Sequence, residues 1–567
     1  MKILGVHYSH DSGAAIIEDG KIIAAVNEER LNRKKMYWGI PLLSINEVFR
    51  LSGFQPKDID FIAYANMTPG GGPQRSFGEP NLRKKAHDVF SQTLPFIAGS
   101  KYFAAAYRNI FSKFRRGKSV LAVLRQIGVE APVRYIDHHL CHAASAYYTS
   151  QFDKDTLVVT TDGTGDGLCS TVNTVSDDYE LQKVASTPTF HTPAGIYASC
   201  TYNMGFTPNK HEGKLTGLAA YGNVDKTYPI FRSIMDVDGL SYKIRGITYG
   251  RPGARKIHLL MQHQKREDIA AGLQKRFEEV GSTLIKNALE KYPRKHIALA
   301  GGAYANVRLN QQISLLPGVE KVYIHPHMGD GGLAVGAALA LWADLQLEKG
   351  IQPKPIPIDT VYFGPSYTDE QIETDLKSAG LKYKFSKNIE QDVAQMLVKK
   401  KIVGRFDGRM EYGPRALGNR SIVADPTDKT INDWLNNRLK RTEFMPFAPS
   451  LLREYAEDAY TNFNQGEIAA KFMTVTFNIK NGYDKKASAV AHVDNTARPQ
   501  TVTKEQNPSY YKLLKIWHEL SGLPIFINTS FNMHEEPIVC SPNDAIRSLK
   551  VGAVDYLAIG NFIAEAR

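Results

Sequence analysis

Three histidines lie within five residues, at positions 138, 139 and 142, in the segment DHHLCHAASAYY that begins at Asp137. The residues that follow favour a helix, and neither glycine nor proline interrupts them. Side chains four positions apart project from the same face of a helix, so His138 and His142 can present two imidazoles to one divalent metal ion. For an isolated HxxxH pattern, an ordinary pair of surface or core histidines is the alternative.

Acidic, glycine-rich turns strengthen the metal interpretation. Asp162 opens the segment DGTGDG directly after a β-prone run that contains the apolar residues 157–159, and Asp330 lies in GDGG between a predicted strand and a helix ending near residue 347. A strand that ends in an aspartate followed by glycines places a carboxylate and free backbone N–H groups at its tip. That arrangement suits a metal bound to a phosphate.

The elements around these residues repeat along the chain. A strand over 2–8, a small-residue turn at 10–15 and a hairpin to residue 26 are echoed by a strand, a glycine turn and a hairpin over 155–178. The repeat indicates a diverged internal duplication, the layout of actin, Hsp70 and sugar kinases. An amphipathic helix is predicted over 268–291. Residues 68–130 interrupt the pattern and form either an insertion that covers a substrate site or a solvated helical excursion.

A proline-rich stretch divides the chain. Residues 349–357 include three prolines in KGIQPKPIP, which suits an extended linker. We therefore expect a first domain over 1–348, a linker over 349–359 and a second domain over 360–567. The segment 407–421 of the second domain holds three arginines, which suits an anion site, with a surface loop as the alternative.

Overall composition sets the class of protein. The 567 residues exceed one hydrophobic core, and 43% of them are hydrophobic. No run of 18 apolar residues and no cleavable leader is apparent, and the four cysteines are scattered, so we expect a cytoplasmic protein without a membrane partner. The formal charge of +12 suits phosphorylated small molecules as well as nucleic acid. Because no basic tail or aromatic-interleaved stripe is present, we expect no nucleic-acid partner.

Taken together, the ordered motifs resemble the O-carbamoyltransferase family of nodulation-factor, cephalosporin, tobramycin and ansamycin carbamoyltransferases. The similarity covers nearly the whole chain and includes HDSGAA, HHLCHAASAYYTS, DGTGDG, HEGKLTGLAAYG, GGAYANVRLN, GDGGLAVGAAL, GRMEYGPRALGNRSI and INTSFN. It implies an α/β protein with an N-terminal actin/Hsp70-like (ASKHA) duplicated domain and a C-terminal YrdC-like domain. The resemblance implies that the C-terminal domain forms carbamoyl-adenylate from carbamoyl phosphate and ATP. The N-terminal domain would then transfer the carbamoyl group to an acceptor hydroxyl.

The resemblance also suggests roles for particular residues. Two nitrogens and two oxygens would bind Fe(II) or another divalent ion, with Mg²⁺ as a further possibility; these ligands are His138, His142, Asp162 and Asp330. The expected catalytic residues are His10, Asp11, His139, Arg498 and Ser530. The expected nucleotide and carbamoyl-phosphate contacts are Lys214, Gly301, Gly302, Asn306, Arg415, Asn419, Arg420 and Asn528.

Two other functions compete with this one. A tRNA carbamoylation enzyme would not need the fused arginine-rich domain, and an actin/Hsp70-like ATPase would not need the paired histidines. The expected acceptor is a hydroxyl of a sugar, aminoglycoside, polyketide or similar small molecule. The sequence leaves open the identity of the acceptor, the native metal, the general base and the oligomeric state.

Overall fold

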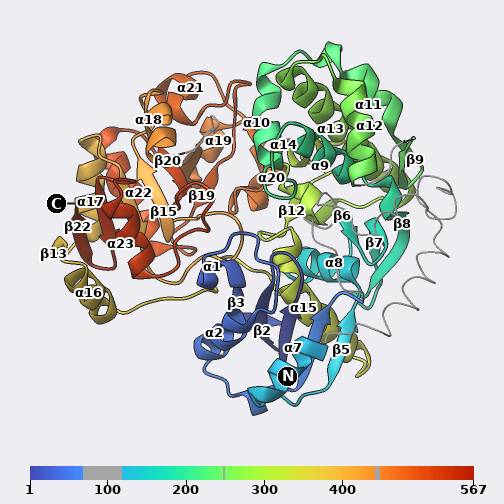
Figure 1. Ribbon diagram of the computed structural model, residues 1–567, viewed down its shortest axis with the longest axis horizontal. Coiled ribbons are helices and arrows are strands. Elements are labelled where there is room, and N and C mark those ends of the chain that lie inside the picture. Colours follow the sequence, from blue (N-terminus) through green and yellow to red (C-terminus); the bar gives the residue numbers. More distant parts are fainter. Residues whose placement is uncertain (68–117, 247–249, 441–446, 567) are drawn as a thin grey trace. The chain divides into compact units, whose positions relative to one another are not determined.

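The computed structural model describes residues 1–67, 118–246, 250–440 and 447–566 (Figure 1). Most of the expected insertion at 68–130 thus lies outside the described residues, and its last part contains helix α7 (Lys118–Gln126). The chain forms two compact units. The first contains residues 1–23 and 36–357, and the second contains residues 24–35 and 358–567. The division at 357 falls within the expected linker, whereas placing 24–35 in the second unit differs from the expected contiguous domains.

Two five-stranded sheets of the first unit share one topology. In each, a central strand (β1 or β6) pairs antiparallel with the next strand of the chain and parallel with a later strand, which pairs in parallel with a third. The first sheet, in the order β3-β2-β1-β4-β5, consists of β1 (Lys2–His7), β2 (Gly13–Glu18), β3 (Lys21–Asn27), β4 (Phe61–Ala65) and β5 (Val133–Ile136). The second, in the order β12-β11-β6-β7-β8, consists of β6 (Thr156–Gly165), β7 (Leu168–Val175), β8 (Leu181–Pro188), β11 (His296–Ala300) and β12 (Lys321–Ile324).

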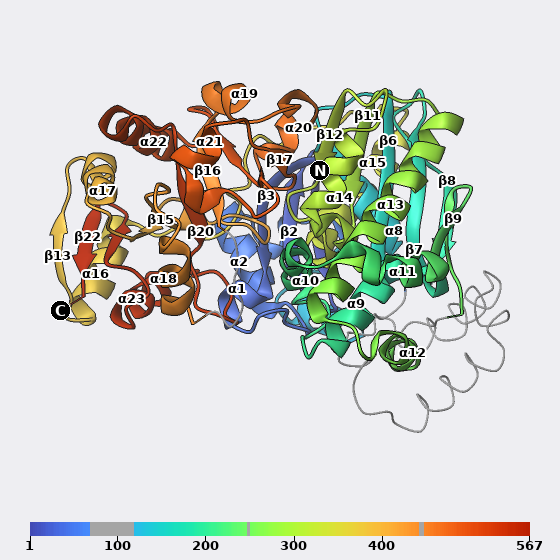
Figure 2. The same cartoon turned by 90° about the horizontal axis from the view of Figure 1, so that it is seen from above.

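Two buried helices pack against these sheets and against each other (Figures 1 and 2). Helix α8 (His138–Tyr148) packs on β6 and β11, and α15 (Leu333–Leu347) packs on β1, β2 and β4. The helices approach so closely that a Cβ on Gly336 would overlap the carbonyl oxygen of Cys141. This close packing fixes the start of α8 relative to the start of α15, and both starts carry polar residues.

The first unit also contains further helices and a small two-stranded hairpin. The long helix α13 (Arg266–Lys291), predicted over 268–291, packs against α9, α10, α11 and α14. The remaining helices and the small hairpin are α2 (Leu42–Ser52), α9 (Pro193–Asn203), α10 (Glu212–Leu218), α11 (Tyr228–Ile234), α12 (Arg251–Met261), α14 (Val307–Ser314), β9 (Met235–Asp238) and β10 (Ser241–Ile244). Within the described residues, no helix is both long and apolar enough to cross a membrane.

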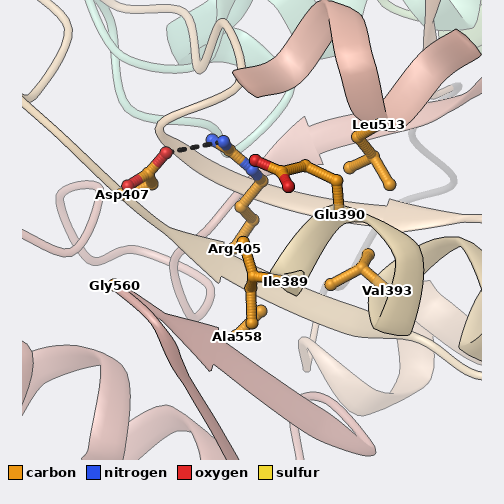
Figure 3. Close-up of a pocket in the computed structure, with 8 residues that line it drawn as sticks. All are labelled: Ile389, Glu390, Val393, Arg405, Asp407, Leu513, Ala558 and Gly560. Atoms are coloured by element: carbon orange, nitrogen blue, oxygen red, sulfur yellow. Dashed lines mark hydrogen bonds and ion pairs between the residues drawn. The ribbon is translucent and has the colours of Figure 1, made fainter. Parts of the chain in front are cut away.

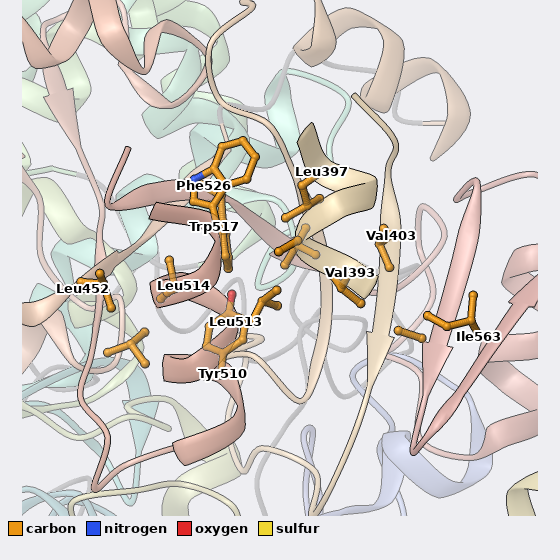
Figure 4. Close-up of a cluster of buried hydrophobic side chains, with 14 residues drawn as sticks. Val393, Leu397, Val403, Leu452, Tyr510, Leu513, Leu514, Trp517, Phe526 and Ile563 are labelled. Atoms are coloured by element: carbon orange, nitrogen blue, oxygen red, sulfur yellow. The ribbon is translucent and has the colours of Figure 1, made fainter. Parts of the chain in front are cut away.

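The second unit is built on an eight-stranded mixed sheet. Its strands, in the order β13-β22-β21-β14-β15-β20-β16-β19, are β13 (Lys382–Phe385), β14 (Val403–Phe406), β15 (Arg420–Ala424), β16 (Ala448–Leu452), β19 (Gln500–Val502), β20 (Ile525–Ser530), β21 (Tyr556–Ile559) and β22 (Phe562–Glu565). Helices α17 (Ile389–Val398) and α22 (Pro508–Ser521) pack together beside it, and their apolar faces form the core in Figure 4, which includes Leu397, Trp517 and Phe526.

Short helices and a two-stranded sheet complete the second unit. They are α1 (Glu28–Asn32), α16 (Asp369–Ser378), α18 (Ile431–Arg438), α19 (Ala456–Ala459), α20 (Phe463–Ala470), α21 (Tyr483–Lys486), α23 (Pro542–Lys550), β17 (Phe477–Asn478) and β18 (Thr496–Ala497). The protein is therefore of the mixed α/β class in both units.

Candidate metal centre and arginine site

Four side chains converge in the first unit with their ligand atoms within 4.8 Å of one another: His138, His142, Asp162 and Asp330. The Nε2 atom of His138 lies 3.2 Å from Asp162 Oδ2 and 3.6 Å from Asp330 Oδ1. The Nε2 atom of His142 lies 3.7 Å and 3.5 Å from the same two oxygens. Two imidazole nitrogens and two carboxylate oxygens in this arrangement suit Fe(II), Mn(II) or Zn(II).

Three different elements hold the four ligands. His138 and His142 are on one face of α8, whose first turn is capped by Asp137 through the N–H groups of His139 and Leu140. Asp330 precedes α15, and Asp162 lies within β6. The glycine turn expected at 162–167 differs here, because β6 continues to Gly165 with an irregular register after Thr161, and Asp162 projects from that irregularity.

Further polar groups orient the ligands. The side chain of Asn66, just after β4, lies 2.8 Å from His138 Nδ1 through its Oδ1 atom. Because an amide oxygen only accepts, Nδ1 carries a proton, so Nε2 is the nitrogen that a metal ion would bind in place of a proton. On the other side, His10 Nε2 lies 3.0 Å from Asp330 Oδ2, which leaves Oδ1 directed at the histidines.

The electrostatics of this cluster indicate a site for a cation. Although burial opposes the charged ring, Asp330 and Asp162 raise the pKa of His138 to about 9. Burial likewise disfavours the ionised form of Asp330, yet His10 and His138 hold the pKa of its carboxyl well below its usual value. The buried atoms Asp330 Oδ1 and His142 Nε2 make no hydrogen bond within the described residues. A divalent ion fits this centre, because it would occupy these unused ligand atoms in place of protons.

The expected catalytic residues of this unit have different surroundings. His10 donates to Asp330, and although burial opposes its charge, Asp330 raises its pKa to about 9, so its Nε2 is already engaged with a carboxylate. Asp11 adopts a positive φ of 55° and is half-buried in the turn before β2. The Nδ1 atom of the buried His139 lies 2.8 Å from Thr160 Oγ1, and burial lowers the pKa of His139 to about 3, so its ring is neutral. The ring centroid lies 5.2 Å from that of His138.

The expected nucleotide contacts of the first unit lie partly beside the metal centre. The N–H of Gly302 donates to Asp162 Oδ1 at 3.1 Å, and Gly301 takes a positive φ of 112° where a Cβ would overlap the carbonyl oxygen of Thr161. Asn306 caps α14 through the N–H of Leu309 and exchanges hydrogen bonds with Gln274. Lys214, on α10, lies with its ammonium group over the ring of Phe206. The glycines therefore remain the candidates for close backbone approach.

A second site lies in the second unit, where two arginines lie together without an acidic partner. Arg415 and Arg498 form no hydrogen bond or ion pair with any described residue, and the Nε atom of each is buried. Burial lowers the pKa of Arg415 to about 10, and burial together with the charge of Arg415 lowers the pKa of Arg498 well below its usual value. Two desolvated like charges at one place are costly unless an anion neutralises them.

The side-chain amides of Asn528 and Gln500 connect the two segments that carry these arginines. Asn528, on β20, donates to the carbonyl of Ala416 at 3.1 Å and to Gln500 Oε1 at 2.9 Å. Gln500, on β19, donates in turn to the carbonyl of Leu417 at 2.8 Å. These bonds tie the segment after Arg415 to the strand that follows Arg498. The Oδ1 atom of Asn528 makes no hydrogen bond in the described part of the chain, and Ser530 is half-buried at the end of β20.

Two residues of the same segment, both expected as ligand contacts, make hydrogen bonds within the fold that the sequence analysis did not predict. Arg420 is fully buried over the ring of Phe406 and donates to four backbone carbonyls, those of Pro365, Asp407, Gly408 and Asn419. Asn419 donates to the carbonyl of Arg409 and accepts from Asn507 and Arg405. The reason is steric, because the segment 407–420 folds back on itself and encloses both side chains.

Glu411 is a site residue that the sequence analysis missed. Its buried Oε1 accepts the N–H groups of Leu417 at 2.8 Å, Asn419 at 2.8 Å and Arg420 at 3.1 Å. This carboxylate closes residues 411–420 into a loop, called the arginine loop below, which contains Arg415. Asn66 was also missed, although a polar residue directly after a parallel strand is a usable signal.

Another pocket of the second unit carries three charged residues, and their charges are already paired (Figure 3). Arg405 donates to Asp407 at 2.6 Å and to Ser509 at 2.7 Å, and Ser509 donates to Glu390 at 2.7 Å. Since its charges pair with one another, this pocket offers an anion far less than the Arg415–Arg498 pair does.

Comparison with known proteins identifies the family. Residues 2–339 match the family described as carbamoyltransferase N-terminus, and residues 394–566 match carbamoyltransferase C-terminus. The chain therefore belongs to the carbamoyltransferase family, whose members are transferases. It is 30% identical to the nodulation protein NolNO of Sinorhizobium fredii, over 99% of this chain and 79% of that protein.

Two further similarities complete the comparison. The chain is 32% identical to a Synechocystis protein described as uncharacterized, over 99% of this chain and 96% of the other. Among solved structures, component A of the Acidaminococcus fermentans (R)-2-hydroxyglutaryl-CoA dehydratase aligns with a TM-score of 0.31 and 14% identity, over 61% of this chain and 98% of that one. A similarity at that TM-score says nothing about fold or function.

Proposed function

We propose that this protein is an O-carbamoyltransferase that activates the carbamoyl group in its second unit and transfers it in its first. The observation that carries the proposal is the Arg415–Arg498 pair, two desolvated cations without an acidic partner among the described residues of a carbamoyltransferase. Such a pair suits a phosphate-rich substrate such as carbamoyl phosphate or the triphosphate of ATP, bound with Mg²⁺.

The activation step balances with carbamoyl phosphate, ATP and one water molecule. Water cleaves carbamoyl phosphate to carbamate and phosphate, and a carbamate oxygen then attacks the α-phosphorus of ATP. Carbamoyl-adenylate forms and pyrophosphate leaves. Arg415 and Arg498 would neutralise the charge on the transferring and leaving phosphates, while Asn528 and Ser530 at the end of β20 would bind the carbamate or the α-phosphate.

The first unit supplies the transfer site. Its His138, His142, Asp162 and Asp330 would hold Fe(II) or another divalent ion, which supplies Lewis-acid chemistry to a bound phosphate or carbonyl. The backbone at Gly301 and Gly302 would allow close approach of the nucleotide. The acceptor hydroxyl attacks the carbamoyl carbon, AMP leaves, and the hydroxyl proton is released. His10 acts by orienting Asp330, and its charged ring beside the site would also favour the anionic AMP.

The shared topology of the two five-stranded sheets supports the proposal that the first unit is a duplicated actin/Hsp70-like domain, and we extend it to a YrdC-like second unit. We propose a small-molecule acceptor, a sugar or natural-product hydroxyl, and a cytoplasmic site of action.

The decisive test needs no acceptor. The purified protein is incubated with ATP and carbamoyl phosphate, and pyrophosphate and carbamoyl-adenylate are followed. We expect both products, and we expect Arg498→Ala to abolish them while His142→Ala keeps them but loses metal and transfer. Hydrolysis of ATP to ADP irrespective of carbamoyl phosphate would contradict the proposal and favour an actin-like ATPase.

A further inference from the structure

A short segment from the beginning of the chain is part of the second unit. Residues 24–35, which include α1 (Glu28–Asn32), pack with residues 358–567, although the family's N-terminal match covers them. Arg33 fixes this segment through the carbonyls of Pro537 and Ile538, both at 2.7 Å, and through Asp544 at 3.2 Å. The second unit is thus completed by residues more than 300 positions away from the rest of its sequence.

One contact of this segment reaches the arginine loop directly. Arg30 is 8% exposed, and its guanidinium donates to the carbonyl of Gly413 at 2.9 Å, two residues before Arg415. Gly413 has a positive φ of 115°, a backbone conformation that residues with a side chain rarely adopt. The adjacent Leu31 packs against a small buried cluster that includes Ala416, one residue after Arg415. The segment therefore contacts the loop directly at Gly413 and packs on the cluster to which Ala416 belongs.

Glu411 and Arg30 hold the same loop through opposite kinds of group. The Glu411 carboxylate accepts from three backbone N–H groups at the end of the loop, whereas the Arg30 guanidinium donates to a carbonyl at its start. With both ends fixed, the unpaired Arg415 stays beside Arg498 despite their mutual repulsion. Without the bond to Gly413, that repulsion would move Arg415 outward.

We propose that Arg30 is a positioning residue for the anion site of the second unit, acting through Gly413 to hold Arg415 beside Arg498. This inference rests on the proposed function, because it takes Arg415 and Arg498 as the anion site. Arg30 itself contacts no substrate. Arg30 keeps the two cations in place before the anion binds. Loss of Arg30 therefore weakens anion binding, whereas the reaction of the bound substrates is little changed.

The test is titration of the full-length chain with inorganic pyrophosphate by calorimetry, in parallel with the KM and kcat of carbamoyl-adenylate formation. We expect Arg30→Met to weaken pyrophosphate binding about tenfold and to raise the KM for carbamoyl phosphate similarly, with kcat within about twofold of the wild type. Arg30→Lys, which can still donate to Gly413, should restore binding to within about threefold.

Arg33→Met is the control, because it removes a second arginine anchor of the same segment, whose hydrogen bonds go to Pro537, Ile538 and the carbonyl of Arg30 and not to the arginine loop. It should bind pyrophosphate as the wild type does. Leu31→Ala, which trims the packing on the cluster that includes Ala416, should weaken binding about threefold and serves if Arg30→Met does not fold. Unchanged binding by Arg30→Met, or equal loss in Arg33→Met, would overturn the role of Arg30.

Failure of the proposed function would give a different experimental result from failure of the role of Arg30. A wild-type chain that binds pyrophosphate but makes no carbamoyl-adenylate would refute that function, and the variants would still decide the role of Arg30. A wild-type chain that binds no pyrophosphate would overturn both.

Discussion

Gly165 and the ring of His138 compete for the same space: a Cβ on Gly165 would overlap the ring atoms Cγ, Cδ2 and Nε2 of His138. The last residue of β6 is therefore a glycine because the imidazole of a metal ligand lies against its backbone. The His138 ring also bonds to Asn66 through Nδ1. If the ring turned to another orientation, this hydrogen bond would be lost.

A methyl group at position 165 should damage the metal centre. In Gly165→Ala, the His138 ring must move, so we expect metal affinity to fall at least tenfold, as measured by equilibrium dialysis against a metal-sensitive dye. Gly163→Ala is the matched control, since a Cβ at Gly163 would meet no atom within 4 Å. Equal affinities in the two variants would contradict the assignment of His138 as a ligand.

Loss of the amide partner of His138 should have a milder effect. Asn66→Leu keeps the size of the side chain but removes the acceptor for Nδ1–H, so we expect metal binding to weaken about 10- to 100-fold. Asn203→Leu, which removes a side-chain bond to the carbonyl of Ala254 far from the ligands, should leave the affinity unchanged. The role of Asn66 would be refuted by calorimetric titrations that cannot distinguish Asn66→Leu from the wild type.

Removing one arginine of the pair should stabilise the anion-free protein. Arg415→Met ends the repulsion of Arg498 and the burial of a charge, so we expect the free energy of unfolding to stay level or rise by about 1 kcal/mol. Pyrophosphate at a hundredfold excess over Kd should stabilise the wild type by about 2.7 kcal/mol and the variant not at all. Thermal unfolding with and without pyrophosphate measures both effects. A clear drop in anion-free stability would indicate an unseen partner for Arg415.

The stability of the first unit should depend on pH through the carboxyl group of Glu212. Burial raises the pKa of this carboxyl to about 7, against an unfolded value near 4.5, although the N–H of Asn209 donates to it at 2.6 Å. The folded state binds the proton more tightly, so this contribution is complete below pH 4.5 and lost as the pH rises through 7.

Glu212→Gln should consequently gain stability over the wild type as the pH rises from 5 to 8, by on the order of 1–3 kcal/mol, and the gain should level off above that. The midpoint of thermal unfolding across this range is the measurement, and Glu290→Gln, at a largely exposed glutamate, is the control. A gain that shrinks with rising pH would contradict the raised pKa.

Local patterns predicted the elements better than they predicted which polar groups do chemistry. The strands at 2–7 and 61–65 and the helices at 138–148 and 266–291 follow from periodicity and turn residues. The His138–His142 pair follows from spacing, whereas the full set of four ligands needed the family resemblance. Arg415 and Arg420 could not be distinguished, because both lie in one glycine-rich window and only tertiary packing decides which is enclosed. Asn66 contacts a residue 72 positions later, a pairing that no local pattern contains.

The discontinuous second unit also affects the order of events during synthesis. Residues 24–35 leave the ribosome about 320 residues before residue 358, where the rest of the second unit begins. At roughly 5–20 residues per second, the segment must wait on the order of tens of seconds for its partner. During that time the buried faces of Glu28, Arg30 and Leu31 have no docking surface, and the long sequence separation slows the final closure. A gene divided at the linker would place these twelve residues on the wrong polypeptide.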